Sequence, residues 1–106
     1  MNLPILVNAF RDIVVNSGKV GGSAISAISA NLMHKRVGNT EASISMLAAW
    51  RESLFTMMVG IPLTRGAGWA EMNRGQVQLN AWRDQLRAVT PGGGACVNEA
   101  TYNNPN

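Results

Sequence analysis

Apolar residues recur at three- and four-residue steps in two stretches of the chain. In residues 4–16 this spacing joins Ile5, Leu6, Ala9, Phe10, Ile13 and Val14. In residues 69–89 it joins Trp69, Met72, Leu79, Trp82, Leu86 and Val89, with the polar Gln76 at the step between Met72 and Leu79. Such spacing is typical of helices that bury one face. We therefore predict helices over about 4–16 and 69–89.

Signals at the ends of these stretches agree with the two helices. Pro4 suits a first turn, where its missing N–H costs nothing. Gly18 follows the first stretch and is predicted to form a left-handed cap. The second stretch stops at Pro91 and the glycines 92–94, while Gly75 weakens its middle by about 1 kcal/mol relative to alanine.

Two further stretches fit both a helix and a strand. Residues 23–33 combine small Ser and Ala residues with two Ile, a composition that suits a strand buried on both faces. Residues 48–59 are rich in bulky apolar side chains, and as a helix they would place Trp50, Leu54 and Met57 on one stripe. The pattern alone does not decide between the two structures.

Composition and charge exclude several functions. The 106 residues carry a net charge of +3, but only 14% are charged and they form no basic run, which argues against nucleic-acid binding. No stretch approaches the roughly 18 consecutive apolar residues of a membrane span. One Cys and one His exclude an internal disulfide and a Cys- or His-pair metal site. The N-terminus does not resemble a signal peptide, and the sequence predicts no localisation.

The residues with chemical potential do not assemble a complete active site. The glycines 92–94 follow a helix instead of opening one, so they do not form a phosphate loop. His34 is expected to be solvated, and Cys96 to be a buried, inert thiol. Glu52 and Glu99 are expected to be carboxylates at the rim of the fold and not general bases. We expect the three tryptophans to belong to the core and not to form a platform on which a ligand stacks. They are Trp50, Trp69 and Trp82.

Two longer motifs add a resemblance. The first is AAWRESLFTMMVG at 48–60, preceded by GNTEASIS, and the second is LNAWRDQLRAVTPGGGACVNEATYNNPN at 79–106. In order and spacing they resemble the C-terminal portion of fungal FAD-linked oxidoreductases of the berberine-bridge-enzyme-like, PCMH type, which have the vanillyl-alcohol-oxidase fold.

The resemblance implies an α+β fragment of a substrate domain. It implies antiparallel strands at about 23–33, 48–59 and 95–98, with helices 4–16 and 69–89 covering the sheet. It also implies that Asn98 and Glu99, together with Cys96, lie near the flavin ring of FAD, where amides and carboxylates orient a substrate or tune the cofactor.

Departures from the family pattern limit what the chain is expected to do alone. Cys96 stands where the family commonly has Tyr. The motifs of the N-terminal FAD-binding domain are absent, as is the family's final segment. We therefore expect residues 1–106 to be a single partial domain that neither binds FAD nor turns over by itself.

The implied function is that of a fragment of an oxidoreductase that acts on a small secondary metabolite in a fungal pathway. One alternative is a remnant without redox chemistry, which binds a hydrophobic small molecule or associates with a full-length flavoprotein. A second alternative, independent of the resemblance, is a small α+β binding module without a cofactor.

Overall fold

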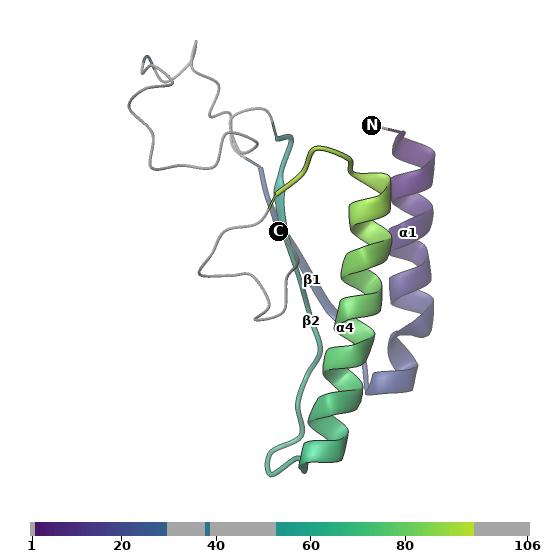
Figure 1. The fold of residues 1–106 in the computed structure, drawn as a ribbon, viewed down its shortest axis with the longest axis vertical. Coiled ribbons are helices and arrows are strands. Elements are labelled where there is room, and N and C mark those ends of the chain that lie inside the picture. Colours follow the sequence, from purple (N-terminus) through teal and green to yellow (C-terminus); the bar gives the residue numbers. More distant parts are fainter. Residues whose placement is uncertain (1, 30–37, 39–52, 95–106) are drawn as a thin grey trace. The chain divides into compact units, whose positions relative to one another are not determined.

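The computed structural model describes residues 2–29, 38 and 53–94. Contacts divide the chain into two units, Met1–Ala27 with Met57–Pro91 and Ile28–Thr56 with Gly92–Asn106. The described elements follow in the order α1, η1, β1, β2 and α4, and all but the outer ends of the strands belong to the first unit (Figure 1).

Helix α1 spans Leu3–Asn16, as the apolar spacing predicts. Asn2 caps its first turn, where its Oδ1 accepts a hydrogen bond from the Ile5 N–H at 3.4 Å. Pro4 lies in this first turn, so its missing N–H leaves no helical bond unmade. At the other end, Ser17 Oγ donates to the Val14 carbonyl at 2.7 Å.

The chain leaves α1 through the 3₁₀ helix η1, Ser17–Val20. The predicted left-handed cap at Gly18 is wrong, because the left-handed residue is Gly21, with φ 80°. Gly22 also has a positive φ, of 124°, and its N–H donates to the Ser17 carbonyl at 2.8 Å. One extra turn of helix therefore moves the reversal of the chain by three residues.

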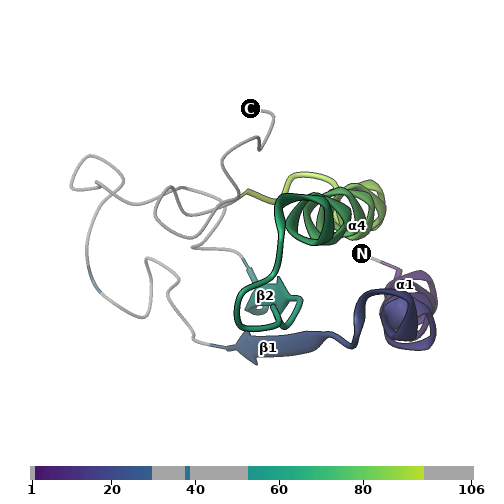
Figure 2. The same cartoon turned by 90° about the horizontal axis from the view of Figure 1, so that it is seen from below.

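Strands β1, Ala24–Ile28, and β2, Thr56–Gly60, form a two-stranded antiparallel sheet. Gly22 faces Pro62, since a Cβ on Gly22 would lie 3.8 Å from Pro62 Cγ. Beyond the opposite end of the ladder, Ser29 Oγ donates to the Leu54 carbonyl at 2.6 Å. The two-stranded ribbon lies beside the helices in Figure 2.

Helix α4 spans Trp69–Val89, and its bounds confirm the prediction. It begins after a turn in which the Ala67 N–H donates to the Thr64 carbonyl at 2.9 Å, with Gly66 at φ 79°. It ends at Val89 and is capped by Thr90, whose Oγ1 donates to the Leu86 carbonyl at 2.7 Å.

The buried apolar residues of the described chain lie between α1 and α4, which run antiparallel and side by side (Figure 1). They are Leu6, Ala9 and Ile13 from α1, and Trp82 and Leu86 from α4. Figure 2 shows the same two helices next to each other from below. No described strand residue is buried, so this core belongs to the helix pair.

The α+β class is confirmed, but the strand predictions need correction. In the described part of 23–33, the strand is Ala24–Ile28, and all five residues are exposed instead of buried on both faces. In the described part of 48–59, residues 53–55 are not in a strand. β2 also extends to Gly60 and is half-buried at most. The third predicted strand, 95–98, lies outside the described residues.

Candidate functional site

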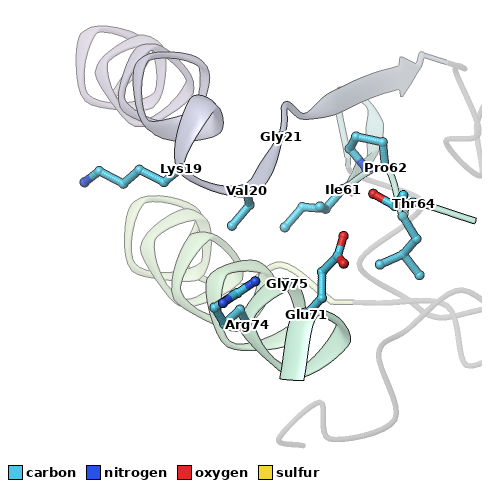
Figure 3. A pocket seen from close by; sticks show the side chains of 10 residues that line it. Lys19, Val20, Gly21, Ile61, Pro62, Thr64, Glu71, Arg74 and Gly75 are labelled. Atoms are coloured by element: carbon cyan, nitrogen blue, oxygen red, sulfur yellow. The ribbon is translucent and has the colours of Figure 1, made fainter. Parts of the chain in front are cut away.

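A hollow of about 360 Å³ lies in the first unit, at the end of the helix pair where η1 meets the N-terminal half of α4. Its apolar lining consists of Val20, Gly21, Ile61, Pro62, Leu63 and Gly75. Its polar lining consists of Lys19, Thr64, Glu71 and Arg74. Three segments that are distant in sequence therefore meet around it (Figure 3).

Each wall of the hollow is positioned by a feature already described. The left-handed Gly21 places Val20 at one wall. The turn closed by Ala67 N–H and the Thr64 carbonyl shapes the loop that supplies the second wall. The first two turns of α4 supply Glu71 and Arg74, three residues apart and therefore on neighbouring turns of one face.

The charged side chains of the hollow are left without a partner by the described part of the chain. Glu71, Arg74 and Lys19 form no ion pair there, whereas Arg83 Nη2 lies 3.0 Å from Asp84 Oδ1. Figure 3 shows the Glu71 carboxylate extending toward the loop of Pro62 and Thr64, and Lys19 pointing away from the other lining side chains. Glu71 and Arg74 are thus the charges that a bound molecule meets.

The floor of the hollow is formed at Gly75, which is buried. Val20 and Ile61 beside it are half-buried, while Thr64 and Arg74 at the rim are exposed. A Cβ at Gly75 would lie 3.9 Å from Ile61 Cγ2, an ordinary contact distance. The absence of a side chain at Gly75 therefore leaves space in the hollow, although neighbouring atoms would not exclude a Cβ there.

The described residues do not fit FAD. A dinucleotide needs a glycine-rich loop whose main-chain N–H groups face the pyrophosphate at a helix N-terminus. Gly66 and Gly68 precede α4, but Glu71 stands where the third glycine of that pattern would be. Its carboxylate would repel phosphate, so we derive no step through FAD from these residues.

The three residues predicted to lie near a flavin, Cys96, Asn98 and Glu99, fall outside the described residues, as do His34, Trp50 and Glu52. Their roles stay predictions. The core role predicted for the tryptophans is confirmed for Trp82, which is 3% exposed, and is wrong for Trp69, which is 78% exposed.

The described residues offer few other candidate sites. They contain no cluster of three or more His, Cys, Asp or Glu side chains able to hold a metal ion. None of the described helices combines the length and the apolar character that crossing a membrane requires. The hollow is therefore the candidate site of the described residues.

Comparison with curated proteins finds a similar segment in the FAD-linked oxidoreductase ZEB1 of Gibberella zeae. The two sequences are 37% identical over 68 residues, which is 63% of this chain and 12% of that oxidoreductase. No protein-family model and no solved structure matches the chain. The predicted similarity to a fungal FAD-linked oxidoreductase is confirmed, and the chain spans a small part of that relative's length.

Sequence reasoning missed the hollow. It placed Gly75 inside a helix and Gly21 in a break, but it did not bring them together. The signal in the sequence was Gly75 itself, because a glycine inside a strongly periodic helix often has a packing or functional cause. Its meeting with Ile61 and Val20 depends on contacts between distant segments, which the local pattern does not contain.

Proposed function

We propose that this chain is a segment of an FAD-linked oxidoreductase and contributes to its substrate domain, while FAD is held by other parts of the protein. The observation that carries the proposal is the 37% identity over 68 residues with an FAD-linked oxidoreductase. The match spans 12% of that relative, so a whole enzyme of this kind contains much more than the matched segment.

Exposed apolar surface supports a larger assembly. On α1, Leu3, Val7 and Val14 are 53–60% exposed and lie along one side of the helix at steps of four and seven. On β1, Ile25 and Ile28 are 38% and 64% exposed. A two-stranded sheet is marginally stable by itself, and exposed apolar patches of this kind mark surfaces that pack against other protein.

The finer parts of the proposal rest on the motifs at 48–60 and 79–106. They favour the berberine-bridge-enzyme-like type and a small secondary metabolite as substrate. We propose that Asn98 and Glu99 orient the substrate beside the flavin, and that Cys96 replaces the family's aromatic hydroxyl there with a small thiol.

The intact mass of the native polypeptide tests the proposal, measured together with its flavin absorbance after purification from the source cells. We expect a mass several times the 11.3 kDa of this chain, and a yellow protein. A colourless native polypeptide of 11.3 kDa would overturn the proposal.

Substitutions in that native polypeptide test the proposed flavin contacts. We expect Asn98→Ala and Glu99→Gln to shift the flavin absorption maxima, because the first removes an amide and the second removes a negative charge from beside the ring. Asn103→Ala, outside the Asn-Glu pair, serves as the matched control and should leave the spectrum unchanged. Equal spectra for all three variants would contradict the assignment.

A second candidate function is association of the chain with a separate, full-length flavoprotein. The exposed Leu3, Val7 and Val14 of α1 favour it, because a partner would cover them. Its test is size-exclusion chromatography of native extract, followed by mass and absorbance. Elution of an 11.3 kDa chain together with a yellow protein supports this candidate, and elution alone rejects it.

A further inference from the structure

Gly75 lies inside the N-terminal half of α4, yet neither backbone conformation nor crowding requires a glycine there. Its φ is not among the positive values of the chain. The nearest atom to an added Cβ is Ile61 Cγ2, at the ordinary distance of 3.9 Å. Glycine inside a helix is less stable than alanine. What the glycine preserves is the open floor of the hollow.

The charged side chains at the hollow favour a ligand that carries both a positive and a negative charge. Glu71 and Arg74 lie three residues apart on α4, face the same hollow and have no ion pair in the described part of the chain. A guanidinium binds a carboxylate through two parallel N–H donors. The carboxylate of Glu71 accepts hydrogen bonds from an ammonium.

The remaining lining sets the size and the apolar part of the ligand. Ile61 and Pro62 form an apolar wall opposite α4, and Val20 closes the side toward η1 (Figure 3). The volume of about 360 Å³ is near the lower end of the roughly 300–1,000 Å³ of ligand pockets. A compact molecule therefore fits better than a dinucleotide or an extended chain.

We propose that this hollow binds a small α-amino acid with an apolar side chain. Its carboxylate pairs with Arg74, its ammonium with Glu71, and its side chain lies against Ile61 and Pro62. The site is independent of the proposed link to FAD, because it uses other residues and needs no flavin. A ligand bound in the hollow would contact both α4 and the loop that precedes it.

Leucine and two matched analogues test the recognition of each ligand group. Leucinamide lacks the carboxylate, and 4-methylpentanoate lacks the ammonium. Binding to the full chain is followed by the amide signals of Gly21 and Gly75 in ¹H–¹⁵N spectra. We expect leucine to shift both signals and to bind about tenfold more tightly than either analogue. No shift at a saturating leucine concentration would overturn the proposal.

Charge variants assign the two ends of the ligand. Arg74→Gln should abolish the preference for leucine over leucinamide, and Glu71→Gln the preference over 4-methylpentanoate. Arg65→Gln makes the same change of charge on the neighbouring loop, at an exposed residue that does not line the hollow. Equal weakening by Arg65→Gln and Arg74→Gln would reject the assigned contact in favour of a general charge effect.

Gly75→Ala separates binding from folding. The added methyl group fills the floor of the hollow, so we expect leucine to bind about fivefold more weakly. The same variant should unfold at a higher temperature, because alanine favours the helix. Loss of binding in a more stable protein cannot result from misfolding. Unchanged affinity in Gly75→Ala would contradict a ligand seated on this floor.

Discussion

Gln85 Nε2 donates a hydrogen bond of 3.1 Å to Asp12 Oδ2, which joins α4 to α1 across 73 residues of sequence. The bond lies at the exposed edge of the helix pair, beside the core formed by Ile13 and Leu86. Further along the antiparallel helix pair in the same register, Val20 and Gly75 line one hollow.

A double-mutant cycle of Asp12→Ala and Gln85→Ala measures this bond. We expect a coupling free energy of about 0.5–1 kcal/mol, because an exposed bond to a charged acceptor competes with water. Chemical denaturation of the four proteins gives the value. Additive effects of the two substitutions would show that the bond contributes nothing in solution.

Ile13→Ala should destabilise the protein strongly. Ile13 is fully buried between the helices, so its truncation leaves a cavity and costs about 2–5 kcal/mol of unfolding free energy. The matched control is Val15→Ala, two residues along the same helix and 74% exposed, with an expected change within about 0.5 kcal/mol. Equal losses in urea denaturation would contradict the helix-pair core.

The tryptophans should differ in their access to solvent. Trp69 is 78% exposed, whereas Trp82 is 3% exposed. We expect Trp69→Phe to remove much of the fluorescence that acrylamide quenches readily, and Trp82→Phe to leave it. The reverse result would mean that α4 is packed through its first turn.

Gly21→Ala should cost about 1–2 kcal/mol, because an L-residue is strained at φ 80°. Gly18→Ala is the control. Both sites have nothing within 4 Å of an added Cβ, but only Gly21 has a positive φ. We expect a change within about 0.5 kcal/mol for Gly18→Ala. Thermal unfolding of both variants tests whether torsion, and not space, restricts this turn.

Gly75→Ala should raise the free energy of unfolding by about 0.5–1 kcal/mol. The reverse substitution, Ala81→Gly, is the control, because Ala81 is an exposed residue inside the same helix. It should lower the free energy of unfolding by a similar amount. A loss of stability in Gly75→Ala would show that the floor of the hollow is tighter than the 3.9 Å contact indicates.

The helices could be predicted because their signals are local. Apolar spacing, Pro4 and Pro91 lie within or beside the segments that they define. The strands could not be predicted to the same extent, because their ends depend on pairing. Ser29 meets Leu54 and Gly22 meets Pro62, and no local pattern contains those partners.

The error at Trp69 has a geometric cause. Trp69 and Trp82 share the predicted stripe, but α1 has 14 residues and α4 has 21, so the helices are about 21 Å and about 32 Å long. With Asp12 opposite Gln85, the shorter helix does not reach the first turn of α4. Periodicity identifies a face of a helix but not how far a partner covers it.

The separation of Asp12 from Gln85 also sets an order of events during synthesis. At about 5–20 residues per second, the ribosome adds Gln85 about 4–15 s after Asp12. A 14-residue helix is marginal in water without a partner. During that interval α4 does not yet cover the apolar face of α1, which consists of Leu6, Ala9 and Ile13. This face can therefore bind chaperones or neighbouring nascent chains. The rate of translation thus determines how long this apolar face is at risk.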